Sequence, residues 1–148
     1  MLVQRVKHAS VEIQGVLRAQ IGQGLLVFLG VGTEDTEEDI EYLASKLTRL
    51  RIFDDAEGVM NLDVQQVGGE VLVVSQFTLQ ASTKKGNRPS YIHAAPEGLS
   101  KPLYEQFVAR VEALLAKKVP TGEFGADMQV ELVNDGPVTL WLDSKNRT

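Results

Sequence analysis

Three hydrogen-bonding side chains follow the most strand-like run of the sequence. The run 70–74 is rich in Val and Leu and opens after two glycines, which is typical of a buried strand. Ser75, Gln76 and Thr78 then stand where further apolar residues would be expected. Because side chains alternate between the two faces of a strand, Gln76 and Thr78 should share one face and Phe77 the other. An unpaired buried polar group costs roughly 1–3 kcal/mol, so this amide and hydroxyl face water, pair internally, or line a site.

The chain lacks the residue patterns of several common catalytic and metal sites. It contains no cysteine, which excludes disulfides, a thiol nucleophile and thiolate metal ligands. His8 and His93 are far apart and form no zinc-binding pattern, and neither a nucleophile elbow nor a phosphate-binding glycine loop is present. The acidic turn at 54–58 lacks the ligand spacing of an EF-hand. We therefore expect no metal and no cofactor.

Length and composition bound the class of protein. With 148 residues, 43% of them hydrophobic, the chain fits one domain over residues 1–148 with a substantial core. No apolar run approaches the ~18 residues of a membrane span, and the first residues are too mixed for a signal peptide, so we expect a cytoplasmic protein without a membrane partner. The net charge of −5 argues against a basic nucleic-acid-binding surface, and no DNA partner is expected.

The elements that must position the polar strand end follow from apolar spacing. Strands are expected over 2–8, 10–13, 16–21, 25–31, 70–79, 128–132 and 138–142. Apolar residues at helical spacing predict one helix that Thr33 or Thr36 caps and a second helix over 101–118, with Pro102 in its first turn. Asn134-Asp135-Gly136-Pro137 is a strong turn signal, and the polar tail after Leu142 is expected to fray.

A polar stretch over about 80–100 leaves directly from the Ser75 strand end. Loops of this length are uncommon in compact domains unless they have a function. It carries Lys84, Lys85 and Arg88, a basic cluster that no helix terminus explains. The residue pattern alone gives this basic loop no structural role.

Two motifs together give these features a more specific meaning. Ser75-Gln76-Phe77-Thr78-Leu79 and Asn134-Asp135-Gly136-Pro137-Val138-Thr139 resemble the signature motifs of the D-aminoacyl-tRNA deacylase (DTD) family, a Ser-Gln-x-Thr-Leu strand and a Gly-cisPro motif. Other similar stretches occur in the same order along nearly the whole chain, at 4–6, 51–53, 60–61, 86–90 and 124–128. The resemblance implies a three-layer β/β/α fold of the α/β class, with mixed sheets and two main helices, assembled as a homodimer.

The resemblance also implies a reaction and a pocket. The reaction is hydrolysis of the ester that joins a D-amino acid to the terminal adenosine at the acceptor end of tRNA. Ser75, Gln76, Phe77 and Thr78 would lie at the pocket. If only the acceptor end of tRNA is bound, a small basic rim is enough, and we expect Lys84, Lys85 and Arg88 to contact tRNA phosphate. Either Thr78 is a covalent nucleophile, which would need an activating base, or backbone amides and the tRNA's own 2′-hydroxyl assist the water.

The second motif is implied to act as a chirality filter. Gly136 and Pro137, joined by a cis bond, would reach from one subunit into the pocket of the other and exclude L-amino acids. Arg5 would hold this segment in orientation, with Met128 close by. From base rates alone a trans bond is expected, since about 5–6% of X-Pro bonds are cis.

Two other classes of function remain open at this point. One is a nucleic-acid-binding dimer without catalysis, whose binding would not depend on the aminoacyl group. The other is an editing hydrolase for a different acyl-tRNA, such as glycyl-tRNA, because glycine has no side chain for a chiral wall to reject.

Overall fold

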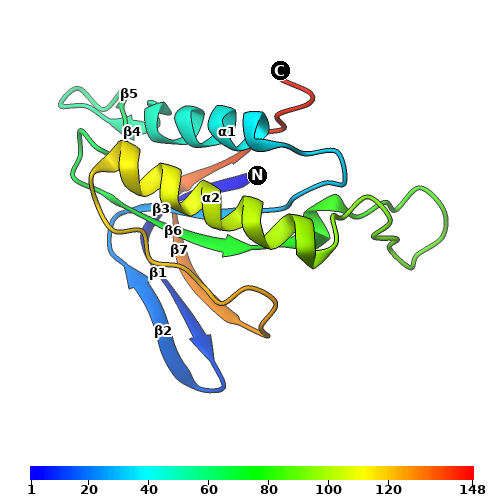
Figure 1. Ribbon diagram of the computed structural model, residues 1–148. Coiled ribbons are helices and arrows are strands. Elements are labelled where there is room, and N and C mark those ends of the chain that lie inside the picture. Colours follow the sequence, from blue (N-terminus) through cyan, green and yellow to red (C-terminus); the bar gives the residue numbers. More distant parts are fainter.

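The computed structural model describes residues 1–148 and contains seven strands, two α-helices and a short 3-10 helix (Figure 1). The strands are β1 (Leu2–Ile13), β2 (Val16–Ile21), β3 (Gly24–Leu29), β4 (Phe53–Asp54), β5 (Met60–Leu62), β6 (Glu70–Ser75) and β7 (Gln129–Trp141). The helices are α1 (Glu37–Arg49), the 3-10 helix η1 (Phe77–Gln80) and α2 (Glu97–Leu115). Neither α-helix has the length and apolar character needed to cross a lipid bilayer.

Five of the strands form one mixed sheet. β1 pairs antiparallel with β3 through its first half and with β2 through its second half, while β7 pairs antiparallel along its other edge. β3 and β6 are parallel, and their register places Leu29 beside Ser75. A parallel pair needs a crossover connection, and the segment that contains α1 and the small β4–β5 sheet provides it.

The sheet curls beneath the helices, so that the molecule has three layers (Figure 1). Both helices pack on one face, over a core cluster of 21 buried residues that includes Leu25, Leu47 and Phe107. On the opposite face, a second cluster of seven residues, Val11 and Leu26 among them, joins the curled half of the sheet to β3 and β6. Leu25 and Leu26 enter different clusters because adjacent side chains of a strand point to opposite faces. The predicted α/β class, with two main helices and layers of helix, strand and strand, is confirmed.

Two pairs of predicted strands are single strands in the structure. The segments expected over 2–8 and 10–13 both belong to β1, and those expected over 128–132 and 138–142 both belong to β7. β1 continues because its two halves have different partners, β3 and β2, while β7 follows it along the other edge. The Asn-Asp-Gly-Pro signal therefore marks a bulge inside β7 and not a reversal of the chain.

The first helix begins where the sequence predicts it, and the second does not. Thr36 is the N-cap of α1, and its amide donates to Oδ2 of Asp39 at 2.9 Å. α2 begins at Glu97, so that Pro102 lies inside the helix and not in its first turn. α2 ends at Leu115, before the two lysines expected to close it, and its C-cap Ala116 has a left-handed φ of 49°.

The C-terminal tail is held against α1, and the prediction that it frays is wrong. Ser144 is buried, and Nζ of Lys145 lies 2.8 Å from Oδ2 of the buried Asp39. The guanidinium of Arg147 lies 3.8 Å from the ring centroid of Tyr42. A polar composition does not reveal these partners, because they come from a helix a hundred residues earlier in the chain.

Candidate active site

A cavity of about 310 Å³ opens where β6 ends. Its wall comes from the ends of β3 and β6, the first turns of α2, and the loop that leads into β7, and most of it is apolar. Ser75, Gln76 and Phe77 line this cavity, and so does Met128. The tertiary structure thus brings one motif of the sequence together with a residue about fifty positions later.

The strand predicted through Leu79 is shorter than expected. β6 ends at Ser75, and the chain turns into η1 after Gln76. Gly30 permits this turn, because a Cβ at that position would lie 2.8 Å from the carbonyl oxygen of Gln76. Nε2 of Gln76 donates a hydrogen bond to Oγ1 of Thr78 at 2.5 Å. The predicted amide and hydroxyl therefore pair with each other beside the cavity, although no strand face holds them.

The hydrogen bonding around Thr78 limits the chemistry that this residue can perform. The bond from Gln76 is the one side-chain hydrogen bond of its hydroxyl, and no carboxylate or imidazole contacts it. An activated nucleophile needs an adjacent base, so this arrangement favours a hydroxyl that donates its own proton to a bound group. The backbone N–H groups of Phe77 and Thr78 find no acceptor in the chain. Free N–H groups of this kind are the donors that stabilise a developing oxyanion.

Sequence reasoning missed the far wall of the cavity, which Ser100, Tyr104 and Phe124 form. The rings of Tyr104 and Phe124 lie 5.7 Å apart between centroids. The Tyr104 hydroxyl donates to the carbonyl oxygen of Val73 at 3.2 Å, and burial raises the pKa of Tyr104 to about 12. Helical spacing alone indicates a core position for these α2 residues, and nothing in the sequence distinguishes a core from a cavity wall.

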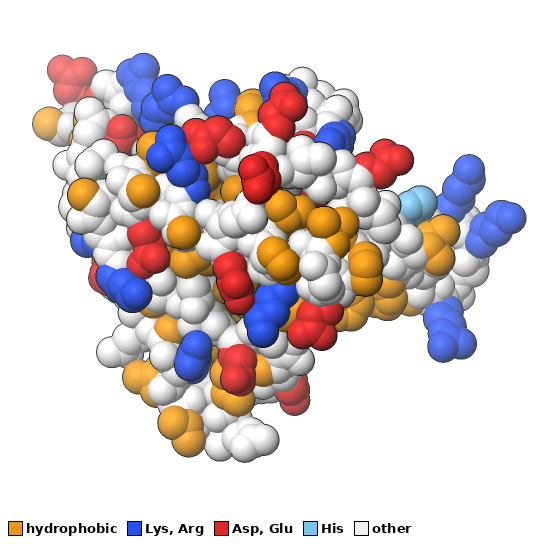
Figure 2. Space-filling model, viewed as in Figure 1, with side chains coloured by type: hydrophobic (Ala, Val, Ile, Leu, Met, Phe, Trp, Pro, Cys, Tyr) orange, Lys and Arg blue, Asp and Glu red, His pale blue; other side chains and the backbone are white.

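The predicted basic loop projects from the body of the molecule (Figure 2). Backbone hydrogen bonds of 2.8 and 2.9 Å between Ser82 and Ser90 close its base. Lys84, Lys85 and Arg88 are exposed and form none of the ion pairs of the structure. Figure 2 shows Lys and Arg side chains gathered at the end of this projection. None of the three lines the cavity, so any contact they make with a ligand lies outside it.

Exposed aromatic residues connect the cavity to the basic loop. Phe77 is 56% exposed and contacts Tyr91 edge-on, with 5.0 Å between the ring centroids. Ile92, the next residue, is 74% exposed. Aromatic rings beside basic side chains are the usual composition of a surface for single-stranded nucleic acid.

Gly136 and Pro137 lie in a bulge of β7. Register shifts in the pairing of β1 with β7 leave residues 135–138 opposite Arg5 alone. Both residues are exposed, and the peptide bond between them is cis, so the cis bond implied by the family resemblance is confirmed. Neither residue lines the cavity of its own chain.

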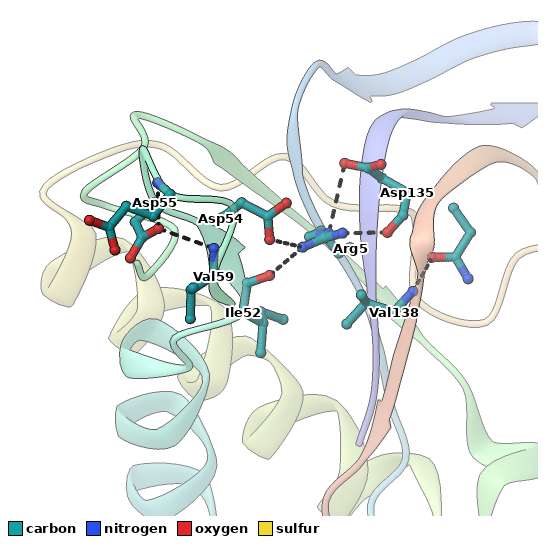
Figure 3. A network of polar contacts seen from close by, with 9 residues as sticks. Arg5, Ile52, Asp54, Asp55, Val59, Asp135 and Val138 are labelled. Atoms are coloured by element: carbon teal, nitrogen blue, oxygen red, sulfur yellow. Dashed lines mark hydrogen bonds and ion pairs between the residues drawn. The ribbon is translucent and has the colours of Figure 1, made fainter. Parts of the chain in front are cut away.

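Arg5 holds the base of this bulge (Figure 3). It is buried, and its guanidinium donates to the carbonyl oxygen of Ile52 at 2.6 Å and to that of Asp135 at 3.0 Å. The carboxylates of Asp54 and Asp135 lie 3.6 and 3.7 Å away. Gly136 has a φ of +128°, and a Cβ there would lie 3.0 Å from Nη2 of Arg5. Arg5 therefore joins the bulge to the segment before β4.

Other polar clusters of the sequence have structural partners. No group of three His, Cys, Asp or Glu side chains is arranged to hold a metal ion. In the acidic turn, Oδ1 of Asp55 accepts the amide protons of Val59 and Glu57 at 3.1 and 2.9 Å (Figure 3). These hydrogen bonds hold the pKa of the Asp55 carboxyl below its usual range. The turn thus uses its carboxylate to satisfy its own backbone.

Comparison with known sequences gives matches over almost the whole chain. The family model described as D-Tyr-tRNA(Tyr) deacylase matches residues 2–143. The D-aminoacyl-tRNA deacylase of Parabacteroides distasonis is 58% identical over 146 residues, which cover 99% of this chain and 97% of that protein. The corresponding protein of Bacteroides thetaiotaomicron is 56% identical over 147 residues, which cover 99% of this chain and 98% of that protein.

Solved structures agree with this fold. A structure named "c-Myc DNA Unwinding Element Binding Protein" superposes with a TM-score of 0.91 at 39% identity, over 96% of both chains. A second, titled "Structural Analysis of a probable eukaryotic D-amino acid tRNA deacylase", has a TM-score of 0.81 and covers 94% of this chain and 95% of that chain. At 16% identity this second likeness supports the fold alone.

Proposed function

Because this chain belongs to the D-Tyr-tRNA(Tyr) deacylase family of hydrolases, we propose that it hydrolyses the ester bond of D-aminoacyl-tRNA and releases a free D-amino acid and tRNA. The observation that carries this proposal is the cavity that Gln76 and Phe77 line next to Thr78. The N–H groups of Phe77 and Thr78 have no acceptor in the chain, and Asp127 is the one charged side chain of the cavity lining. An aminoacyl ester is already activated, so such a site is sufficient for its hydrolysis. Translation takes place in the cytoplasm, and we expect the protein to act there.

In the proposed mechanism the protein supplies orientation and oxyanion stabilisation. Water attacks the ester carbonyl, and the negative charge that develops on its oxygen is stabilised by the N–H groups of Phe77 and Thr78. Such a donor is typically worth ~2.7–4 kcal/mol in the transition state. The 2′-hydroxyl of the tRNA assists the water, and the 3′-oxygen leaves with a proton. Thr78, fixed by Gln76, positions the substrate and does not attack it.

We assign the chirality filter to the bulge that carries Gly136 and Pro137. The exposure of both residues, and their absence from the cavity of their own chain, support insertion into the cavity of a second copy. The filter thus requires a homodimer. A stiff backbone wall near the α-carbon clashes with every L side chain, and a clash with the wrong ligand is a common source of specificity. Glycyl-tRNA has no side chain to reject, so we expect slow hydrolysis of it as well.

The test of the function compares D-tyrosyl-tRNA with L-tyrosyl-tRNA, with purified protein and a control without enzyme. We expect rapid loss of the D ester alone. Hydrolysis of neither ester, with tRNA still bound, would instead favour a binding protein without catalysis. Duplex DNA belongs in the binding assay, because one structural relative carries a DNA-binding name.

Thr78→Ala tests the role of the hydroxyl. If Thr78 only positions the substrate, this variant keeps measurable turnover with a raised KM. Complete loss of turnover with unchanged tRNA binding would contradict the mechanism and would restore the covalent alternative.

Pro137→Ala tests the filter, because it removes an exposed ring from the proposed wall. We expect hydrolysis of L-tyrosyl-tRNA to rise while hydrolysis of the D ester is retained. Pro89→Ala, in the exposed basic loop, is the matched control and should leave the ratio of D to L unchanged. Light scattering on the same samples gives the oligomeric state, and a monomer that still discriminates would exclude a filter contributed by a second copy.

A further inference from the structure

Ser100 places a hydroxyl on the apolar face of α2. It shares that face with Leu103, Tyr104 and Phe107, which are all buried, at the three-, four- and seven-residue spacing of one helix side. Ser100 itself is only 9% exposed, and it lines the cavity. An apolar side chain is the expected residue at such a position.

The Ser100 hydroxyl has no partner within the chain. The Ser100 amide donates to the carbonyl oxygen of Pro96 at 2.9 Å, but the side chain takes part in no hydrogen bond of the structure. Every fully enclosed side-chain nitrogen or oxygen has a partner. The Ser100 oxygen must therefore border open space, and the space that Ser100 lines is the cavity. A hydroxyl both donates and accepts hydrogen bonds, so this group is available to a ligand that enters the cavity.

We propose that Ser100 is a specificity-determining residue that hydrogen-bonds the polar edge of the terminal adenine of the substrate. The inference rests on the proposed function and adds to it a contact in the far wall of the cavity. The side chain of the amino acid is a poor candidate for the space beside Ser100. A fixed hydroxyl in an enclosed wall would favour some side chains over others, although the filter must accept them. The terminal nucleoside is the constant part of the substrate.

The surroundings of Ser100 suit a flat heteroaromatic ring. Tyr104 and Phe124 offer aromatic surface, and Met128 and Val74 offer aliphatic surface. A purine has apolar faces for these side chains and a polar edge for a single hydroxyl, and base–aromatic contacts of this kind are a usual source of nucleotide affinity.

The first measurement is the binding of free adenosine to wild-type protein and to Ser100→Ala by calorimetry. Loss of one hydrogen bond should weaken binding roughly 3- to 10-fold. The KM for D-tyrosyl-tRNA should rise by a similar factor while kcat stays unchanged. Ala favours helix, so the variant should fold, and thermal unfolding confirms it. Ser45→Ala on α1, remote from the cavity, is the matched control and should leave both constants unchanged.

The second measurement asks whether Ser100 reads the base. D-tyrosyl esters of adenosine, purine riboside, 1-deazaadenosine and 7-deazaadenosine are compared in both proteins. With the analogue that lacks the group contacted by Ser100, the KM of the wild-type protein should rise to the value that Ser100→Ala shows for the adenosine ester. The KM of Ser100→Ala should not rise further with this analogue.

Three results would overturn the inference. The first is equal affinity of both proteins for adenosine, and the second is an equal rise in KM for all analogues in both proteins. The third is an effect of Ser100→Ala on KM that differs between D-alanyl and D-tyrosyl esters. The last would place the amino-acid side chain at Ser100. Adenosine binding that depends on Ser100, without hydrolysis of D-tyrosyl-tRNA, would retain the base contact and reject the proposed function, so the two failures are distinguishable.

Discussion

At the scale of single residues, Arg5 joins segments that lie far apart in the sequence. Its planar guanidinium donates in two directions, to the carbonyl oxygens of Ile52 and Asp135, with Asp54 close by. A lysine offers one nitrogen and cannot reproduce this fork. The orientation of the bulge therefore depends on the shape of the arginine side chain as well as on its charge.

We expect Arg5→Lys to lower the free energy of unfolding by ~1–3 kcal/mol, because at least one buried carbonyl oxygen loses its donor. Urea denaturation at pH 7 measures this change. Arg110→Lys is the matched control, since the Arg110 pair with Glu41 is exposed, and it should give no measurable change. Equal stability of the Arg5→Lys protein and the wild type would show that Arg5 does not hold the bulge.

The ion pair between Asp39 and Lys145 gives the tail a pH dependence. Burial raises the pKa of Asp39, but hydrogen bonds from Lys145, the Thr36 amide and Ser144 together bring this pKa below its usual value. A lowered folded-state pKa contributes stability that is present above the unfolded pKa of about 3.9 and is lost as the pH falls through the folded pKa. The raised pKa of Lys145 keeps its own contribution present until well into the alkaline range.

We therefore expect Lys145→Ala to be less stable than wild type at pH 7, with the difference shrinking once the pH falls below the ordinary aspartate pKa of about 3.9 and through the lowered folded-state pKa of Asp39. Urea midpoints at pH 3, 5 and 7 provide the measurement. Lys101→Ala, exposed on α2 and without an ion pair, should show no such trend. A difference that is the same at all three pH values would exclude the ion pair as its cause.

At the scale of elements, the end of α2 is a place where local conformation and residue type disagree. Ala116 adopts φ 49° and ψ 43°, a left-handed conformation that costs a residue with a Cβ roughly 1–2 kcal/mol. Glycine is the usual residue at this position of a helix end. The chain turns here toward the strand-like contact of Thr121 with Val73, so the conformation is required by the path of the chain.

Ala116→Gly should therefore raise the free energy of unfolding by ~0.5–1 kcal/mol, the strain relieved minus the added freedom of the unfolded chain. Thermal and urea unfolding measure it. Ala109→Gly, an exposed position inside the same helix, is the matched control and should lower stability by about 1 kcal/mol. Two changes of the same sign would contradict this account.

At the scale of the whole molecule, charge is distributed unevenly. The net charge is −5, yet Lys84, Lys85 and Arg88 are exposed on one loop, and Figure 2 shows Lys and Arg side chains gathered at the end of a projection of the molecule. A small basic projection is enough if only the acceptor end of tRNA is bound. Binding should then depend on salt through this loop alone.

Changing these three basic residues to Gln should weaken tRNA binding and flatten its salt dependence. The log–log slope should decrease by about 0.7 for each phosphate that the variant no longer neutralises. Binding of uncharged tRNA at four salt concentrations measures the slope. Gln substitutions at Lys7, Lys46 and Lys101, which lie elsewhere on the protein, are the matched control. An unchanged slope in the loop variant would reject the proposed binding of phosphate by this loop.

The sequence by itself predicted the parts that depend on local pattern. Apolar runs predicted β3 and β6, and helical spacing and Thr36 predicted α1. The polar residues after the buried strand left internal pairing and the lining of a cavity both open, and Gln76 does both in the structure. These features are local because alternation, helical periodicity and capping involve neighbours in sequence. The family resemblance added the cis bond at Gly136, which local base rates oppose.

The tertiary structure decided the features that depend on which distant segment of the chain packs against a given residue. The same Asn-Asp-Gly-Pro signal serves a turn or a bulge, and the continuous pairing of β7 with β1 made it a bulge. The apolar face of α2 is core where the sheet covers it and cavity wall where the sheet ends, so the hydroxyl of Ser100 acquires a function only in the fold. Periodicity reports that a face is apolar but carries no information about what packs against it.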